Sequence, residues 1–307
     1  MSGWLRAVVI GSLPLLCGCT SLSGIDDKVF DLADAGAGEQ DGGGGAGADG
    51  GDGGDAFDGG SCSDPVLVFT ESAFQQVVPD KMHYLHAKAW GAGGNTECNH
   101  IPDDGAGGVG GFTEAIFAVN PGEPLIVIVG GRRLAALTPQ EQIDFGFPGR
   151  GAGGLSGVFE GPPPLGEGDQ LRALIIAGGG GGAGVDAPDG GATGNDCHPG
   201  GTGNHTDSGG AGSMLGENGD EDINSGGGGY QGGKAGDMQS QDEADWGGFG
   251  GTGYVRAGAL SERMGSVERS APLPPGSDDE DWEPPAGVQE KPGRVVLRFY
   301  CSQPETW

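Results

Sequence analysis

Blocks of consecutive glycines divide this chain, and any fold must find a place for them. The run ALIIAGGGGGAG at 173–184 is typical, because an apolar segment passes directly into five glycines, and 71 of the 307 residues are glycine. Ordering glycine costs more backbone entropy than ordering any other residue. The glycines follow no strict three-residue period, which excludes collagen. They therefore form either flexible linkers or a packed structure held by backbone hydrogen bonds.

The same run must be tested as a phosphate-binding turn, since Gly179, Gly181 and Gly184 have the spacing G-x-G-x-x-G. That chemistry requires a helix directly after the glycines, because the N–H groups of its first turn contact the pyrophosphate. The residues that follow, VDAPDGGATGND, are rich in proline, aspartate and glycine and do not favour a helix. No Lys-Ser or Lys-Thr pair completes a Walker loop. The sequence therefore disfavours a nucleotide site.

Residues 1–18 resemble a bacterial export signal that ends in a lipobox. Arg6 precedes the apolar run AVVIGSLPLL, which is short for a membrane-spanning helix, and LCGC follows at 16–19. The resemblance implies cleavage before Cys19 and acylation of that cysteine, which would anchor the chain to a lipid bilayer. Thr20, in place of aspartate, fits delivery to the outer membrane, facing the periplasm or the cell surface. An ordinary signal peptide with incidental cysteines is the alternative.

Residues 19–61 are predicted to form a disordered tether, because they are rich in aspartate and glycine and have almost nothing to bury. The stretch GGDGGDAFD at 50–58 matches a nonapeptide that binds Ca²⁺ where consecutive copies stack, but it occurs once. The formal net charge of −29 argues against nucleic acid and against an anionic membrane surface as electrostatic partners.

Four cysteines follow the proposed lipidation site, and an exported chain meets an oxidising compartment in which two disulfides are the default. Four cysteines allow three pairings. Cys62 and Cys301 flank the apolar segments and would staple the ends of a domain at 62–307, which leaves Cys98 and Cys197 to pair. A zinc site is the alternative, although no C-x-x-C spacing occurs.

Short segments with β-branched and aromatic residues, separated by turn residues, predict an all-β domain at 62–307. The predicted strands cover 66–70, 74–78, 82–90, 111–119, 124–131, 172–178, 253–258 and 294–301. The one candidate for a helical turn is LTPQEQIDF at 137–145. Strands from both ends of the domain must pair, which favours a β-sandwich. Residues 262–292 are interpreted as a surface excursion before the last strand.

Candidate catalytic and metal-binding patterns are incomplete. TDSGG at 206–210 is similar to the nucleophile segment of chymotrypsin-like proteases, but the preceding glycine and a matching histidine segment are missing. DCH at 196–198 could belong to a metal site or to a disulfide beside polar residues. The acidic stretches at 216–226 and 278–283 are interpreted as solvated loops, with a weak Ca²⁺ site as the alternative. We expect no catalytic residues, no metal ligands and no cofactor.

Aromatic residues lie within or beside the glycine blocks, where a flexible linker would leave them exposed. Trp90, Tyr230, Trp246 and Phe249 are therefore candidate ligand-binding residues. Their presence also suggests that the blocks pack. One possibility is the extended helix with three residues per turn, which lets glycine backbones lie close together and hydrogen-bond to each other.

The order of these segments resembles the glycine-rich domain of bacterial and phage surface proteins, over roughly residues 66–301. The resemblance rests on FTESAFQQVVPDKMHYLHAKAWGAGGN and GGVGGFTEAIFAVNPGEPLIVIVGG. The later ALIIAGGGGGAG, GGGGYQGG, GGFGGTGYV and PGRVVLRFYC are similar to the ectodomain region of anaplastic lymphoma kinase and its leukocyte relative. The resemblance to these proteins implies a tumour-necrosis-factor-like, jelly-roll β-sandwich with an inserted polyglycine II helix bundle. Those receptors bind cytokines, and some phage tip adhesins bind receptors through a similar bundle.

The sequence as a whole predicts a membrane-anchored, noncatalytic surface lipoprotein that binds or adheres to a protein or glycan ligand. A self-associating structural protein of the envelope or matrix is one alternative. A hydrolase that uses the acidic loops is another. A shared fold supports the architecture more strongly than the function.

Overall fold

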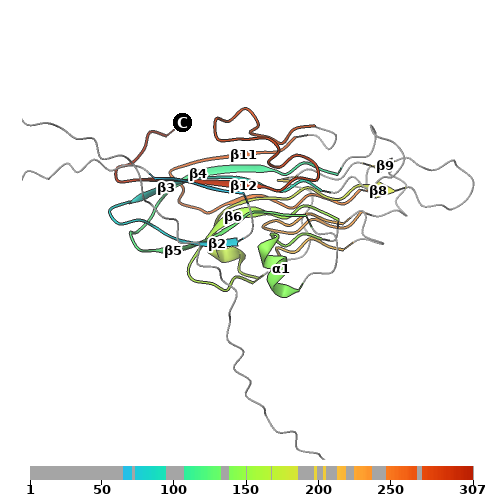
Figure 1. Cartoon of the computed structure of the whole chain (residues 1–307), viewed down its shortest axis with the longest axis horizontal. Coiled ribbons are helices and arrows are strands. Elements are labelled where there is room, and N and C mark those ends of the chain that lie inside the picture. Colours follow the sequence, from blue (N-terminus) through green and yellow to red (C-terminus); the bar gives the residue numbers. More distant parts are fainter. Residues whose placement is uncertain are drawn as a thin grey trace, which may run out of the picture. The chain divides into compact units, whose positions relative to one another are not determined.

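Two five-stranded antiparallel sheets build the described part of the chain, in agreement with the predicted all-β class (Figure 1). The computed structural model describes residues 65–70, 73–94, 107–132, 138–149, 151–166, 168–185, 197–198, 203–204, 213–218, 225–236, 247–267 and 272–306. The predicted signal peptide and tether, together with Cys19, Cys62, Cys98 and Trp246, lie outside these residues. Within the described ranges, no helix is long and apolar enough to cross a membrane.

The first sheet, sheet A, has the strand order β1-β12-β3-β4-β11, and sheet B has the order β10-β7-β6-β5-β2. The strands of sheet A are β1 (Val66–Phe69), β12 (Arg294–Tyr300), β3 (Tyr84–Trp90), β4 (Phe112–Ala118) and β11 (Ser261–Gly265). Those of sheet B are β10 (Tyr254–Val255), β7 (Ala173–Ala177), β6 (Ser156–Glu160), β5 (Pro124–Ile128) and β2 (Ala73–Val77). The short strands β8 (Gly184–Val185) and β9 (Cys197–His198) pair with each other.

The main core lies between the two sheets, and the side-chain alternation of the strands explains it. Successive side chains of a strand point to opposite faces. Leu85, Ala87 and Ala89 of β3 therefore join one buried cluster with residues of β5, β6 and β7. The Thr113 hydroxyl of β4 donates a 2.9 Å hydrogen bond to the Ile176 carbonyl of β7 and so links the two sheets within this core.

The predicted helical turn is confirmed as α1 (Pro139–Asp144). Thr138 is its N-cap: the Thr138 hydroxyl accepts a 3.3 Å hydrogen bond from the Glu141 backbone N–H, and the Thr138 N–H donates a 2.7 Å bond to the Glu141 carboxylate. This reciprocal capping satisfies two backbone donors that the helix leaves unpaired. A second apolar cluster, which includes Ile126, Ile128 and Phe159, lies on the outer face of sheet B.

Four strands, β6, β8, β9 and β11, were not predicted from the sequence. Strand β6 was missed because it begins inside the glycine-rich stretch GRGAGGLSG at 149–157. Close packing requires Gly157 of this strand, since an added Cβ would lie 2.6 Å from the Ile175 carbonyl oxygen. Strand β11 occupies the start of the predicted excursion at 262–292, which was wrong in that part. The residues of β11 are largely polar and exposed at the edge of sheet A, so they carry little apolar alternation.

The five glycines 178–182 continue β7 and are hydrogen-bonded to several other glycine segments. Their contacts return to the same neighbouring segment every third residue. The Gly178 and Gly181 carbonyls accept from Gly111 and Gly108, those of Gly179 and Gly182 accept from Gly251 and Gly248, and the N–H groups of Gly179 and Gly182 donate to Gly228 and Ser225. The backbone groups of this block are therefore satisfied by other parts of the chain.

Packing explains why these positions are glycine. A Cβ added to Gly180 would lie 1.9 Å from the Gly108 carbonyl oxygen, and one added to Gly178 would lie 2.0 Å from the Gly251 carbonyl oxygen. None of the five glycines has a φ in the left-handed region, so conformational freedom is not the reason. The block is packed, and the flexible-linker alternative for it was wrong.

Candidate functional site

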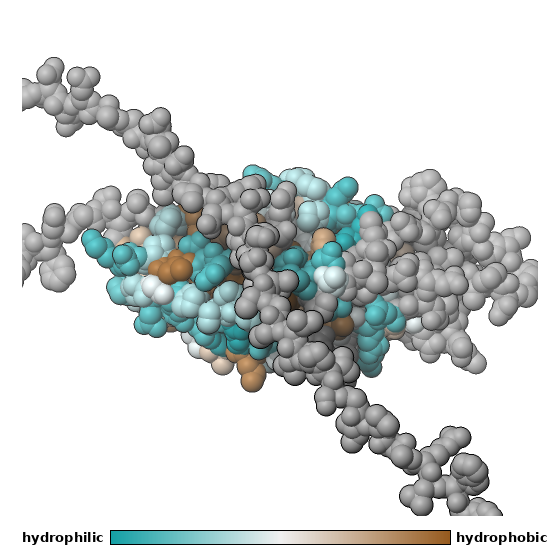
Figure 2. Space-filling model, turned by 60° about the horizontal axis from the view of Figure 1, so that its bottom comes forward, coloured by the Kyte–Doolittle hydropathy of each residue, from teal (hydrophilic) through white to brown (hydrophobic). Residues whose placement is uncertain are grey.

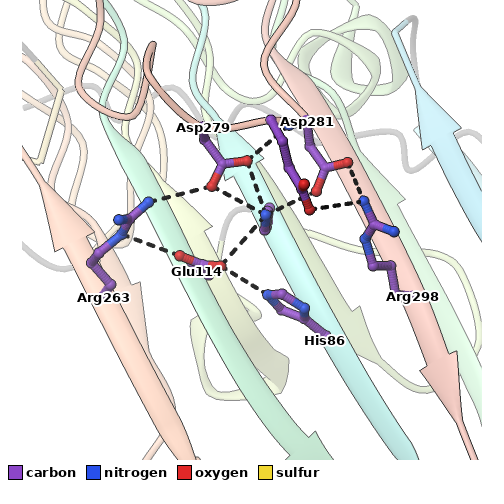
Figure 3. A network of polar contacts seen from close by, with 8 residues as sticks. His86, Glu114, Arg263, Asp279, Asp281 and Arg298 are labelled. Carbon is purple, nitrogen blue, oxygen red and sulfur yellow. Dashed lines mark hydrogen bonds and ion pairs between the residues drawn. The ribbon is translucent and has the colours of Figure 1, made fainter. Parts of the chain in front are cut away.

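The outer face of sheet A carries a cluster of charged side chains beneath residues 272–293, a segment that we call the strap (Figure 3). Because Leu85, Ala87 and Ala89 face the core, His86 and Lys88 of β3 face the other way. We call the residues that meet there the Lys88 cluster: His86, Lys88, Glu114, Arg263, Asp279, Asp281 and Arg298.

Strand register brings the sheet members of this cluster together. Glu114 of β4 is opposite Lys88 of β3 on one side and opposite Arg263 of β11 on the other. Arg298 of β12 is opposite His86. Directly opposed residues on one face of a sheet are close enough for their side chains to interact. The sheet therefore presents cations around one central carboxylate.

The Lys88 ammonium joins the sheet to the strap. Its Nζ donates to both oxygens of Asp279, at 2.9 and 3.1 Å, and lies 2.8 Å from Asp281 Oδ2. Glu114 Oε1 is 3.7 Å away. The Lys88 side chain is only 6% exposed, and those of Asp279 and Asp281 are 9% and 11% exposed. A nearly buried lysine is thus surrounded by three carboxylates.

The surroundings fix the charge of these groups. Burial alone would lower the pKa of Lys88, but its contacts with Asp281 and Asp279 outweigh burial and raise this pKa above its ordinary value. Burial would raise the pKa of Asp281, but Lys88 and Arg298 together hold it below its ordinary value. Lys88 is therefore a cation near neutral pH, held between the carboxylates of the sheet and the strap.

The remaining members extend the network along the sheet. His86 Nε2 lies 2.9 Å from Glu114 Oε1, and Arg263 Nε lies 3.1 Å from Glu114 Oε2. Arg298 donates a short hydrogen bond to Asp281. Figure 3 shows the two strap aspartates pointing toward the strands, with Glu114 and His86 turned toward them from the sheet.

Aromatic packing attaches the strap next to this network. Trp90, Phe112 and Val296 form a buried cluster on the same face, and Trp282 of the strap packs against them. The Trp282 indole N–H donates a 2.9 Å hydrogen bond to the Ala286 carbonyl, which keeps the strap folded on itself. The Arg263 guanidinium lies 4.9 Å from the centre of the Phe112 ring, a distance typical of cation–π contact.

The candidate binding aromatics are not gathered in one place. Trp90 is fully buried beneath the strap, so its ring offers no surface to a ligand and serves packing instead. Tyr230 is half-buried and stacks on Tyr254, with ring centres 4.0 Å apart. Phe249 is also half-buried. The tyrosine pair belongs to the apolar cluster of sheet B, whereas Trp90 belongs to that of sheet A.

The predicted acidic loop at 278–283 differs from a solvated loop. The carboxylates of Asp279 and Asp281 are buried against Lys88. Sequence reasoning missed this arrangement, because the strap meets β3 across 191 positions of the chain and no local pattern signals that contact. Within the described residues, no group of three histidine, cysteine, aspartate or glutamate side chains is placed to hold a metal ion.

One predicted cysteine can be followed. Cys301 is disulfide-bonded. Its Sγ lies 3.6 Å from the sulfur of Met82, at the end of the main core. The backbone of Cys197 forms part of β9. The pairings Cys62–Cys301 and Cys98–Cys197 stay predictions.

No model of a protein family matches the chain, and no curated protein matches its sequence. Function must therefore be argued from the geometry. The Lys88 cluster holds paired charges around a protonated amine, an arrangement suited to fastening one segment over another.

Proposed function

We propose that this protein is a membrane-anchored, noncatalytic surface lipoprotein that binds or adheres to a protein or glycan ligand. One observation carries the proposal: the titratable side chains of the Lys88 cluster are paired with one another and fasten the strap. An active site would need some of these groups free to exchange protons or to attack a substrate. Here they stabilise a rigid surface, which suits a binding scaffold.

We further propose that the glycine segments form a polyglycine II bundle inserted in a sandwich of the tumour-necrosis-factor-like, jelly-roll kind. The three-residue recurrence of hydrogen bonds along 178–182 supports the bundle, because that helix has three residues per turn. The pairing of β1 with β12 supports a jelly-roll-like closure of the chain ends. The β5-β6-β7 meander differs from successive jelly-roll strands, which alternate between sheets.

For the N-terminal part, we propose an acylated Cys19 and a disordered tether at 19–61 that present the domain from the outer membrane. The lipobox-like LCGC at 16–19 supports the anchor. The disulfide of Cys301 supports an oxidising compartment. Mass spectrometry of the N-terminal peptide of the full chain tests acylation of Cys19, and an unmodified Cys19 thiol would overturn it.

We also propose that the domain needs no cofactor. Around Asp279 and Asp281, the Lys88 ammonium already occupies the position that a cation such as Ca²⁺ would take between two carboxylates. Isothermal titration of the full chain with CaCl₂ should give no saturable heat from this loop, and the Asp279→Asn variant should behave like the wild type.

Self-association is the second candidate function, and the exposed sheet edges favour it. Among the described strands, β1 pairs with β12 alone and carries the half-exposed Val66 and Val68. Open edges of this kind can pair with another copy. The net charge of −29 opposes such assembly at low salt. Sedimentation of the full chain in detergent at low and high salt separates the candidates, since higher assemblies support a structural role.

Binding itself is tested with the full chain, purified in detergent and labelled with a fluorophore. It is applied to a glycan array and, in parallel, used to select peptides from a random 12-residue library displayed on phage. Saturable binding in either assay supports the proposal. Absence of binding in both, together with turnover in a panel of ester, peptide and glycoside substrates, would replace it with an enzymatic function.

A further inference from the structure

The aromatic side chains on the outer face of sheet A are covered rather than exposed. Trp90 and Phe112 are buried there, and Trp282 of the strap packs against them. On the face of the molecule shown in Figure 2, exposed apolar side chains form only small patches among hydrophilic ones. Scattered apolar residues of this kind are ordinary on a protein surface and identify no ligand. The covered face of sheet A, by contrast, gathers aromatic rings in one place.

This covered face also gathers cations, although the chain as a whole is strongly acidic. Because Val295 and Leu297 of β12 face the main core, the arginines between and beside them face outward. Four of the 15 lysine and arginine residues of the chain lie on the face, namely Lys88, Arg263, Arg294 and Arg298. Cations beside aromatic rings complement a ligand that is acidic and carries an aromatic side chain.

The strap supplies a ligand of this chemistry from within the chain. In its stretch DDEDWE at 278–283, carboxylates contact all four cations, and the indole of Trp282 contacts the aromatic rings of the face. The ion pairs are Lys88–Asp279, Arg263–Asp279, Lys88–Asp281, Arg298–Asp281 and Arg294–Glu283. The covering segment therefore shows which chemistry the face accepts.

The first part of the strap, residues 272–286, is attached to the sheet by side chains. We call this part the cover. The structure describes all of its residues, and every backbone–backbone hydrogen bond that the cover makes stays inside the strap. From Gly287 onward the attachment changes: the Gly110 N–H donates to the Gly287 carbonyl, and the Glu290 N–H donates to the Gly94 carbonyl, both at 2.9 Å. The cover can therefore leave the sheet while the backbone after it stays in place.

The cover leaves two donors of the face unpaired. Within the described residues, the Trp90 indole N–H and Arg294 Nε have no hydrogen-bond partner, although Trp90 is fully buried and Arg294 is only 7% exposed. These two residues are directly opposite each other in the register of β3 and β12. Buried donors without an acceptor cost free energy and are rare in native proteins. A ligand that brings an acceptor to this point would fit the face better than the cover does.

We propose that the outer face of sheet A is a binding site for an acidic polypeptide segment with an aromatic residue, and that the cover is an internal competitor for this site. This inference rests on the proposed binding function and names its surface and its class of ligand. A polypeptide is favoured over an acidic glycan because the cover is a polypeptide that buries an indole ring on the face. Since only the open state binds, the apparent dissociation constant equals the intrinsic one divided by the open fraction.

The test uses the full chain in detergent and a fluorescein-labelled peptide, GSDDEDWEPPA, which copies residues 276–286. The variant Asp279→Asn/Asp281→Asn weakens the cover and leaves the face intact, so it should bind the peptide about tenfold more tightly than the wild type. The matched control, Asp278→Asn/Glu280→Gln, changes the net charge equally at two exposed positions and should bind the peptide as the wild type does.

Two further arms test the chemistry of the site. Adding Arg298→Gln to the opened variant Asp279→Asn/Asp281→Asn should abolish the tenfold gain, because it removes a cation of the face. A peptide with asparagine and glutamine in place of its acidic residues should not bind the opened variant. Binding of polygalacturonate but not of the acidic peptide would replace the polypeptide partner with an acidic glycan.

Hydrogen exchange distinguishes an opened cover from a damaged domain. In the opened variant, exchange should accelerate within 272–286 and stay slow in β3 and β12. Equal acceleration in those strands would show that the cover is an integral part of the sandwich, and unchanged exchange at 272–286 would show that its charges do not hold it. Either result overturns the competition.

Failure of this inference is separable from failure of the binding function. An opened, folded variant that does not bind the acidic peptide overturns the site, while the glycan array and the phage selection still decide whether the chain binds a ligand elsewhere. Absence of binding in all of these assays overturns both proposals together.

Discussion

Lys88 of β3 and Asp279 of the strap are 191 positions apart in the chain, yet the Lys88 ammonium donates a 2.9 Å hydrogen bond to the Asp279 carboxylate. The contact is nearly excluded from water, with side chains 6% and 9% exposed. Removing one partner of a buried ion pair leaves an uncompensated charge, which costs far more than the pair itself contributes. Lys88 is therefore the residue whose loss should release the strap.

Replacement of Lys88 by methionine should destabilise the domain by about 3–5 kcal/mol, because Asp279, Asp281 and Glu114 would lose the buried cation that they share and keep their contacts with the more exposed Arg263 and Arg298. Hydrogen exchange at 272–293 should accelerate first, since the strap loses its attachment to sheet A. Denaturant unfolding and hydrogen-exchange mass spectrometry measure the two effects. Lys291→Met, an exposed change within the same strap, is the control. Unaltered strap protection in Lys88→Met would show that the other contacts of the strap, such as the packing of Trp282 and the Arg298–Asp281 ion pair, hold it without Lys88.

Stability should fall in acid because folding lowers carboxyl pKa values. The hydrogen bond from Arg256 lowers the pKa of Glu160, and Lys88 and Arg298 overcome burial to lower that of Asp281. A lowered folded pKa gives stability that is present above the unfolded value, about pH 4, and is lost as pH falls through the folded value. Unfolding free energy measured between pH 2 and pH 6, as a series, should therefore drop below about pH 4. Asp281→Asn should show a shallower drop than Asp278→Asn, an exposed neighbour.

Stability should also fall at alkaline pH, and here the cause is a pKa that folding raises rather than lowers. The raised pKa of Lys88 gives stability that is complete below the unfolded value, about 10.4, and is lost as pH rises through the folded value. Wild-type protein should therefore lose stability above about pH 10.4. The Lys88→Met variant has no ammonium group to titrate there, so its stability should change less over that range. Unfolding measured from pH 8 to pH 11 checks the difference. Parallel curves for the two proteins would contradict the assigned role of Lys88.

The sequence predicted strands from runs of apolar and β-branched residues, including the edge strands β1 and β2, whose apolar side chains are partly exposed. Segments such as 82–90 and 294–301 were found because their alternation or apolar runs mark one or two buried faces, and they correspond to β3 and β12. Strand β11 was missed because it is a polar edge strand, and β6 because its glycine resembles the blocks around it. Helix α1 lies within LTPQEQIDF at 137–145, the segment predicted as a helical turn, and its capping by Thr138 and Glu141 is a local feature of the chain.

The candidate site was largely beyond sequence reasoning. The interpretation of 278–283 as a solvated loop considered its own charges but not the lysine that it meets. Register places Lys88 beside Glu114, and only the closure of the strap brings Asp279 to both. Alternation alone assigns Lys88 to the face opposite Ala87, without saying that another segment covers that face. Trp90 was predicted to bind a ligand because it lies beside a glycine block. It is buried instead, because the strap covers the face of sheet A on which it lies.

The glycine block at 178–182 should tolerate no side chain. Gly180→Ala would bring a methyl group within 1.9 Å of the Gly108 carbonyl oxygen, so backbone must move, and we expect a loss of about 3 kcal/mol or more. Gly180→Val should be worse. Gly168→Ala is the matched control, because a Cβ at Gly168 meets no atom within 4 Å and its φ is not left-handed. Calorimetry of the three variants measures their melting temperatures. Equal melting temperatures for Gly180→Ala and Gly168→Ala would show that the block is not packed.

Asn204 should be the most sensitive residue at the junction of sandwich and glycine segments. Its side-chain amide donates to the Phe112 carbonyl at 2.6 Å, and its side-chain oxygen accepts from the Gly178 N–H at 2.8 Å. With φ at 65°, asparagine or glycine suits the position. Asn204→Gly keeps that conformation and removes only the side chain, so it should cost about 1–3 kcal/mol.

Asn204→Asp keeps the shape but sets a carboxylate against the Phe112 carbonyl, and it should cost more near pH 7 than near pH 3. Chemical unfolding of both variants at both pH values tests this order; equal losses of Asn204→Asp at the two pH values would contradict the assigned amide orientation.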